Sequence, residues 1–448
     1  MTRHPSPSLS PRTAGMLAVL LSAVFLAQFD FFVVNVAAPS LGRELHAGPA
    51  ALELVVGGYA FAYAAGMITG GRLGDRYGHR RVFVCGVAGF TLASLLCGLA
   101  LTPAQLVAAR LLQGLAGAVM VPQVLAVLTA ALPSGGQRRA LGWYGAASGL
   151  GSIAGQVLGG LLLDADLWGL GWRVAFLLTV PVGALAVPAA LRLLPRLPPA
   201  ERPARLDVRG ALGIAGSLGL LLAPLTFGRE QGWPAWTWAC MAASLPAAAL
   251  TLVRQRALLR RGGSPVLDLS LLRDRVYVCG LAAGGAFLAY FASFMFTLTL
   301  LLQDGRGLSP LAAGSVFAPM GVAFACSSLL GGRAVRRFGL RAVRGGALLI
   351  ALGLLSLRWA SDAPLPWLVA ALVMIGTGNG LVLPRLLGIS LLRIPPTSAG
   401  VGAAMLTTVQ QFGGAAGVAA VGTTGAQAGL VLCVWALVGV VQRTAGRA

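Results

Sequence analysis

Asp30 is the acidic residue of this sequence that we expect to lie well inside a long apolar run. It belongs to the stretch Phe29-Asp30-Phe31-Phe32-Val33-Val34-Asn35-Val36-Ala37-Ala38-Pro39. If that run crosses a bilayer, holding the carboxylate charge there costs on the order of 2.5–3.5 kcal/mol. We therefore expect Asp30 to be paired with a cation, or to be protonated for part of a working cycle.

Another apolar run offers a partner for this acid. Arg110 and Gln113 are three residues apart and therefore share one face of a helix, while Gly114 and Gly117 allow a neighbouring helix to come close. A buried arginine is expensive enough that it needs a pairing or functional reason. The chemistry that these residues suggest is reversible protonation of Asp30 beside Arg110, and the alternative is a static buried salt bridge.

The composition fixes the class of protein that must position these residues. Of the 448 residues, 57% are hydrophobic and 10% are charged, and apolar runs of about 20 residues or more follow one another between short polar breaks. Such runs predict membrane-spanning helices, because barrel strands would alternate over about ten residues. The net charge of +21 comes from arginines in the gaps between the runs. This distribution indicates membrane topology and excludes a nucleic-acid partner.

We predict an all-α integral membrane protein with fourteen transmembrane helices. Two six-helix bundles, 1–194 and 276–448, flank a region of linkers and two extra helices, 195–275. The expected spans are 14–39, 50–71, 81–101, 104–132, 138–163, 172–194, 210–228, 236–254, 276–303, 310–332, 342–360, 365–388, 400–424 and 426–442. The first run is too long for the core of a signal peptide, and we expect it to be retained.

The arginines fall mainly into alternate gaps, which predicts that both termini are cytoplasmic. The expected cytoplasmic gaps contain Arg72, Arg76, Arg80, Arg81, Arg138, Arg139, the two linkers, Arg333, Arg336, Arg337, Arg341 and Arg344. The opposite gaps contain isolated arginines such as Arg43, Arg173, Arg229, Arg306 and Arg358. The six cysteines lie singly and only three histidines are present, so we expect neither a metal site nor a cofactor.

One loop sequence occurs twice. The segment 71–81 (GRLGDRYGHRR), after the second expected helix, recurs as 332–341 (GRAVRRFGLR) after the second helix of the last six. Two halves related by duplication are typical of secondary transporters, whose sites lie near the midplane between the halves.

Over nearly its whole length the sequence resembles the major facilitator superfamily, and within it the fourteen-helix drug:proton antiporters. The first copy of the repeated loop is similar to the signature loop of the superfamily. The resemblance implies a conformational clamp between an acid and arginines, and the alternative is a loop that only sets topology. Its residues here are Gly71, Asp75, Arg76, Gly78, Arg80 and Arg81. In the second copy Arg336 replaces the acid.

Two further motifs carry the resemblance. The first helix is similar to the motif of the fourteen-helix branch that ends in Asn-x-Ala-x-Pro, although Phe32 stands where Thr is usual, and Arg110 with Gln113-Gly114 is similar to the fourth-helix motif. This resemblance implies that Asp30 and Arg110 couple transport to protons.

The fifth expected helix is similar to the antiporter motif of the exporters. Small residues on one face of it permit close helix packing, and they are Gly151, Gly155, Gly159 and Gly160. Gln156 stands where the motif usually has Pro, which puts the kink in doubt. Ordinary tight packing without a role in transport is the alternative.

Aromatic and amide side chains are candidates for a substrate cavity. Phe287, Tyr290 and Phe294 follow helical spacing and form a stripe that can stack on a flat or cationic compound, or can instead face lipid. The complete set of cavity candidates is Gln113, Tyr59, Phe287, Tyr290, Phe294, Gln410 and Gln411.

Together these patterns predict proton-coupled export of a small amphipathic or hydrophobic compound by alternating access. Uptake of a nutrient is the alternative, which the scarcity of polar groups in the expected cavity disfavours. A membrane enzyme or receptor is a remote alternative, because clustered catalytic side chains and a soluble domain are absent from the sequence. We further expect a monomer in the bacterial inner membrane, with lipid and a small-molecule substrate as its partners.

Overall fold

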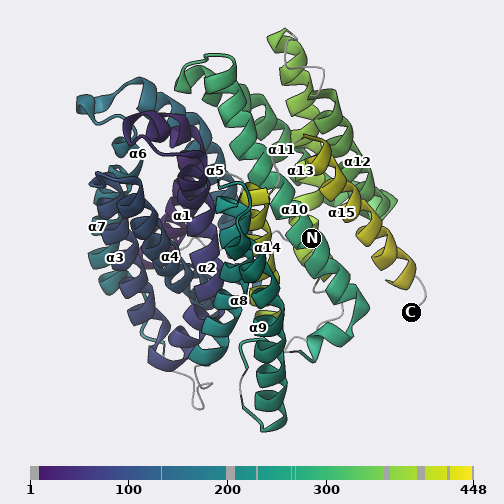
Figure 1. Cartoon of the computed structure of the whole chain (residues 1–448). Coiled ribbons are helices and arrows are strands. Elements are labelled where there is room, and N and C mark those ends of the chain that lie inside the picture. Colours follow the sequence, from purple (N-terminus) through teal and green to yellow (C-terminus); the bar gives the residue numbers. More distant parts are fainter. Residues whose placement is uncertain are drawn as a thin grey trace, which may run out of the picture.

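The computed structural model of the chain describes residues 10–132, 134–197, 207–228, 231–263, 265–267, 269–357, 364–390, 399–420 and 424–445. These ranges contain helices and turns but no strand (Figure 1). Fifteen α-helices are formed in them, and α6 and α7 are consecutive pieces of one span. The prediction of fourteen membrane-spanning helices is confirmed.

The first seven helices form six spans. They are α1 (Pro11–Glu44), α2 (Pro49–Tyr77), α3 (His79–Gly98), α4 (Pro103–Ala131), α5 (Ser134–Asp164), α6 (Arg173–Leu177) and α7 (Thr179–Leu193). Ser10 and Thr102 cap α1 and α4 by accepting a hydrogen bond from a backbone N–H, and a proline follows each cap. A short 3₁₀ turn, η1 (Leu167–Gly169), precedes α6.

The remaining helices begin with two that pack mainly on each other. They are α8 (Val208–Phe227) and α9 (Ala235–Arg260), followed by α10 (Arg275–Leu300), α11 (Pro310–Phe338), α12 (Arg341–Ser356), α13 (Leu365–Ser390), α14 (Ala399–Ala420) and α15 (Thr424–Ala445). The 3₁₀ turn η2 (Leu271–Arg273) precedes α10, and a π-helical turn, η3 (Leu301–Gly305), extends it. Eleven of the described spans are at least 18 residues long and apolar enough to cross a membrane.

The helices of each half pack mainly with one another. In the first half α1 packs on α5 and α4 lies between α2 and α3, while in the second half α10 packs on α14 and α15, and α13 on α11 and α12. Two helix pairs supply most of the contacts between the halves, α2 with α14 and α5 with α11. The helices α8 and α9 pack on each other, and α8 also contacts both α2 and α14 (Figure 1). The extra helix pair therefore lies beside one of the two seams between the halves.

Both copies of the repeated loop contain a glycine of positive φ at the end of a helix. Gly78 ends α2 with φ 89°, and Gly339 ends α11 with φ 60°. Residues that carry a side chain rarely adopt a positive φ, so glycine is favoured at this point in each copy. The internal repeat seen in the sequence thus includes a glycine of positive φ in each copy.

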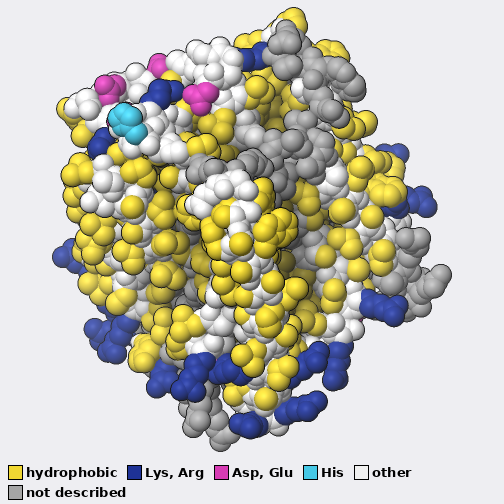
Figure 2. All heavy atoms as spheres, viewed as in Figure 1, with side chains coloured by type: hydrophobic (Ala, Val, Ile, Leu, Met, Phe, Trp, Pro, Cys, Tyr) yellow, Lys and Arg dark blue, Asp and Glu magenta, His cyan; other side chains and the backbone are white. Residues whose placement is uncertain are grey.

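The charges separate toward the two ends of the helices. Figure 2 shows Arg side chains gathered along the lower edge of the view, and acidic side chains with a histidine at the upper edge. Arg229, Arg358 and the side chains of Arg138 and Arg139 lie outside the described residues.

A polar cluster near the arginine-rich end joins α8 to α9. Asp207, the N-cap of α8, pairs with Arg254 at 2.7 Å and accepts a hydrogen bond from Gln255, also at 2.7 Å. Burial works to raise the pKa of Asp207, but the hydrogen bonds from Arg254, Gln255 and the Gly210 amide outweigh it and hold that pKa at about 2. The oxygen of Gln255 accepts a hydrogen bond from the backbone N–H of Leu267. The second linker is thereby fixed to the end of α9.

The glycines of α5 let α1 approach its backbone. A Cβ atom added to Gly151 or to Gly155 would lie 2.6 Å from the carbonyl oxygen of Phe25 or Phe29, and one added to Gly159 would lie 2.7 Å from Val33. Gly160 faces the other half instead, against the backbone of Pro310 in α11. Side chains larger than hydrogen would force these helices apart.

We predict that Gly155→Ala lowers the thermal stability of the purified protein, because overpacking costs about 1–3 kcal/mol. Gly149→Ala is the matched control in the same helix, since nothing lies within 4 Å of a Cβ atom there. That change should be neutral or stabilising through helix propensity. Thermal unfolding in detergent, followed by tryptophan fluorescence, measures both; equal midpoints for the two variants would contradict the close packing of α1 on α5.

Candidate functional site

The residues expected to do chemistry meet between four helices of the first half. Asp30 comes from α1, Arg110 and Gln113 come from α4, and Ser94 comes from α3. Each of these four side chains is 0% exposed. The backbone of α2 closes the remaining side, where Val55 presents its carbonyl oxygen to Arg110.

Hydrogen bonds connect these four side chains into one network. Arg110 donates from Nη1 to Asp30 Oδ2 and to Gln113 Oε1, and from Nε to the carbonyl oxygen of Val55 at 3.0 Å. Gln113 donates from Nε2 to Asp30 Oδ1 and to Ser94 Oγ, both at 2.8 Å. Both oxygens of the carboxylate are therefore satisfied, as an ion pair without access to water requires.

Aromatic rings cover the guanidinium group of Arg110. Its Cζ atom lies 4.5 Å from the ring centre of Tyr59 and 5.8 Å from that of Phe176. Cation–π contacts of this kind stabilise a desolvated arginine by about 2 kcal/mol. The Nη2 atom of Arg110 has no hydrogen-bond partner among the described residues. Tyr59 and Gln113, predicted as cavity residues, thus belong to the surroundings of the ion pair.

The network lies next to the other half of the molecule. Phe29 and Val33, on either side of Asp30 in α1, belong to an apolar cluster that also contains Ala292 and Phe296 of α10. A movement of α10 relative to α1 would therefore change the packing beside Asp30.

At the end opposite the arginine-rich one, contacts close the gap between the halves. Arg43 pairs with Asp304 at 3.1 Å, and Gln303 donates a hydrogen bond to the carbonyl oxygen of Val36 at 2.9 Å. Arg43 and Asp304 are 62% and 49% exposed, and such an exposed pair contributes about 0–1 kcal/mol. The buried Gln303 bond and the contact of Gly160 with Pro310 are therefore the stronger part of this closure.

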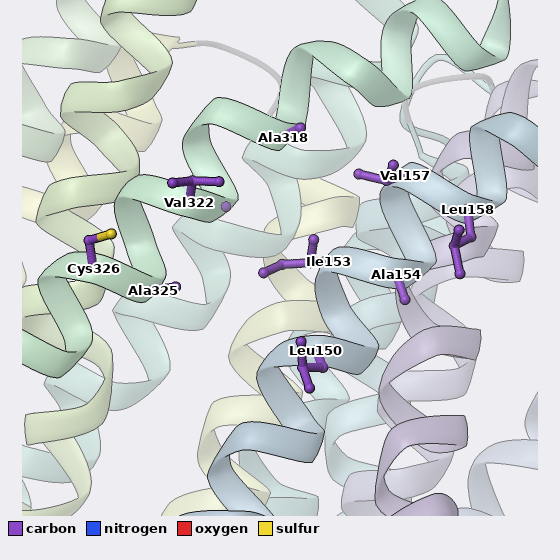
Figure 3. A pocket seen from close by; sticks show the side chains of 10 residues that line it. Leu150, Ile153, Ala154, Val157, Leu158, Ala318, Val322, Ala325 and Cys326 are labelled. Carbon is purple, nitrogen blue, oxygen red and sulfur yellow. The ribbon is translucent and has the colours of Figure 1, made fainter.

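A groove lies along the seam between α5 and α11. It has a volume of about 470 Å³. Its walls are apolar side chains from the two helices, and Figure 3 shows Leu150, Ile153 and Val157 on α5 opposite Ala318, Val322 and Cys326 on α11. The two helices touch beyond it, where Gly314 meets the backbone of Gln156. The seam is thus closely packed where Gly160 and Gly314 lie.

The signature loop makes contacts that its sequence did not reveal. Asp75 lies 3.6 Å from His79, one turn further along the chain. Arg72 donates a hydrogen bond to the carbonyl oxygen of Pro265 in the second linker, and Arg80 donates to that of Leu191. Gly71 faces Pro122 of α4, Arg76 covers the ring of Tyr77, and Arg81 is exposed. The role of this loop as a clamp stays a prediction.

The aromatic stripe of α10 is buried among the helices. Phe287, Tyr290 and Phe294 pack with helices of the second half, and the hydroxyl of Tyr290 donates to Asn379 at 3.2 Å. Phe291 of the same helix contacts Phe32 of α1, with 5.9 Å between the ring centres. Gln410 and Gln411 of α14 are half-buried. A contact of these residues with substrate stays a prediction.

Sequence reasoning missed several members of the Asp30 network. Ser94 and Phe176 gave no signal, because serine and phenylalanine are common in apolar helices and these two are far from Asp30 along the chain. Val55 contributes through its backbone, which side-chain type cannot reveal.

An all-helical membrane protein of two packed halves, with a buried acid–arginine pair in the first, has the architecture of a secondary transporter. A sequence model of the Major Facilitator Superfamily matches residues 20–418. The chain belongs to this superfamily and is a multi-pass membrane transporter.

Curated relatives match along most of their length. The probable actinorhodin transporter of Streptomyces coelicolor is 38% identical over 91% of this chain and 71% of its own length. The puromycin resistance protein of Streptomyces alboniger is 36% identical over 93% of this chain and 83% of its own length. The cephamycin export protein of Amycolatopsis lactamdurans is 35% identical over 96% of this chain and 89% of its own length.

Solved structures show the same fold at low sequence identity. A peptide transporter of the POT family superimposes with a TM-score of 0.71 and 14% identity, covering 96% of this chain and 98% of its own. The xylose transporter of E. coli in an inward-open conformation superimposes with a TM-score of 0.65 and 15% sequence identity, with 95% of each chain covered. These likenesses support the fold alone.

We predict that Arg110→Leu destabilises the protein by about 3–5 kcal/mol, because it leaves the buried Asp30 carboxylate without its cation. Arg43→Leu, which breaks an exposed ion pair, should cost less than about 1 kcal/mol. Adding Asp30→Asn to Arg110→Leu should recover much of the lost stability. Thermal unfolding in detergent compares the variants; a similar loss for Arg43→Leu and Arg110→Leu would contradict the buried ion pair.

Proposed function

We propose that this protein exports a small, partly apolar compound from the cytoplasm in exchange for protons. The observation that carries the proposal is the fully buried network of Asp30, Arg110 and Gln113 beside the second half. The relatives, which include antibiotic export and resistance proteins, support the direction of transport and the kind of cargo.

The network can hold or release a proton without large local movement. In the conformation described here Asp30 accepts from both Arg110 and Gln113, an arrangement that stabilises the carboxylate. A proton placed on one oxygen of Asp30 removes the ion pair. Arg110 then still donates hydrogen bonds to the Val55 carbonyl and to Gln113. Its Nη2 atom, which has no partner among the described residues, can donate to a further acceptor.

Alternating access supplies the change of environment that this exchange needs. The halves meet along α2 with α14 and α5 with α11, so rocking about these seams opens one end while closing the other. Phe296 of α10 shares an apolar cluster with Phe29 of α1, so the same movement changes the surroundings of Asp30. Protonation and opening are coupled because both act on this one region.

For the setting of the protein we propose a monomer in the bacterial inner membrane with both termini cytoplasmic. By the order and bounds of the helices, Arg76, Arg256, Arg260 and Arg336 lie at one end of the helices, whereas Asp164, Asp166 and Asp304 lie at the opposite end. Cytoplasmic loops carry the excess of positive charge. No cofactor or catalytic step is part of the proposal, since the proton is the coupling ion.

We predict that Asp30→Asn reduces proton-driven transport at least tenfold, because asparagine can neither gain nor lose the coupling proton. Proteoliposomes of the purified protein, with an imposed pH gradient and ethidium as the probe, measure the uptake that corresponds to export. Exchange of labelled for unlabelled probe, which needs no net proton movement, should persist in the variant.

The control for this experiment is Asp164→Asn, the same chemical change at an exposed acid. It should leave proton-driven transport within twofold of that of the unaltered protein. Undiminished proton-driven transport by Asp30→Asn would reject the role of Asp30.

The orientation can be tested separately with reporters. A fluorescent protein fused after Ala448 should be fluorescent in bacterial cells, and alkaline phosphatase fused there should be inactive, because α15 ends on the side of the arginine-rich loops. Active alkaline phosphatase at this position would reverse the proposed orientation.

A further inference from the structure

Gln156 of α5 has a buried side chain whose amide oxygen lacks a hydrogen-bond donor among the described residues. Its side chain is 4% exposed, and its Nε2 atom is 3.6 Å from the sulfur of Met295 in α10. Its Oε1 atom accepts no hydrogen bond from the residues that the structure describes. A buried amide oxygen without a donor is unfavourable, so such a group needs an explanation.

Gln156 lies where helices of both halves meet. The preceding residue, Gly155, packs on Phe29 and Phe32 of α1, while the carbonyl oxygen of Gln156 contacts Gly314 of α11. Met295, which the amide approaches, shares an apolar cluster with Phe32. The unfilled oxygen therefore lies in an apolar and aromatic region at the interface between the two halves.

Helix packing does not account for this amide. The close approach of α5 to α1 depends on the glycines, and α5 continues as one helix from Ser134 to Asp164 through Gln156. A methionine or leucine would fill the same volume without burying an unpaired oxygen. The neighbouring Ile153 and Val157 are apolar and line the groove along the seam (Figure 3).

We propose that Gln156 selects the substrate by accepting a hydrogen bond from it. The compound then carries at least one N–H or O–H donor on an otherwise apolar or aromatic body, because the surroundings of the amide offer Phe32 and Met295. This inference deepens the proposed export function and rests on it. It assigns the unfilled oxygen a partner that is present only when substrate is bound.

The test compares two cations that differ in hydrogen-bond donors. Ethidium carries two aryl amino groups, whereas tetraphenylphosphonium has no N–H or O–H group. Gln156→Met removes the acceptor and keeps the length of the side chain. We expect it to raise the KM and Kd for ethidium about tenfold, the effect of one lost hydrogen bond in a buried site, and to change those for tetraphenylphosphonium less than twofold.

Two further variants separate recognition from folding. Gln156→Glu retains an oxygen acceptor and should restore much of the affinity for ethidium. Gln427→Met makes the same change at another buried glutamine with an unfilled oxygen, which contacts Thr297 within the second half. That control should not alter the ratio of the two KM values.

Each outcome decides between the proposals. The role of Gln156 would be overturned if Gln156→Met raised the KM for both cations equally or left the KM for ethidium unchanged. It would also be overturned if Gln427→Met had the same effect on the KM values as Gln156→Met. Binding to the purified protein is measured alongside transport. If the unaltered protein binds both cations and transports neither, the export function fails, and the binding ratio still tests Gln156. Failure of the unaltered protein to bind ethidium overturns the inference.

Discussion

The burial of an acid and an arginine inside the first half constrains much of the structure around them. Lipid offers no hydrogen bonds, so every polar atom of this pair depends on protein partners. α4 supplies both Arg110 and Gln113, α3 supplies Ser94 and α2 supplies the carbonyl oxygen of Val55. Gly114 allows α4 to lie against the backbone of α2 at Tyr59, which brings that ring over the guanidinium. The packing of four helices and the stability of the ion pair therefore depend on each other.

The contacts between the halves are of a different kind. They consist mainly of small residues and backbone atoms, such as Gly160 against Pro310, Gly314 against Gln156 and Gly57 against Ala415. Contacts of this type hold by van der Waals packing and can be exchanged without stranding a charge. The costly polar network thus lies inside one half, and the seams between the halves are built mainly of small residues. The extra helices α8 and α9 lie along one seam, and the apolar groove lies along the other.

Much of the candidate site followed from residue type and spacing. Asp30, Arg110 and Gln113 were predicted together, because a buried acid needs a cation and the three-residue spacing places the arginine and the amide on one face. The partners of the signature loop could not be predicted in the same way. Asp75 lies beside His79, and Arg72 contacts Pro265 nearly two hundred residues away, a distance along the chain that no local pattern bridges. In the sequence, Gln156 was noted only because it stands where the antiporter motif usually has proline.

The sequence by itself determined the number of spans, the membership of the superfamily and the internal repeat. These properties depend on apolar length, on charge and on short motifs, which act locally along the chain. Tertiary structure alone decided that Ser94 and Phe176 surround the ion pair, that the glycines of α5 face α1, and that the oxygen of Gln156 has no donor. The physical reason is that hydrogen bonding and close packing depend on distances between helices that are far apart in sequence, and those distances exist only after the helices have assembled.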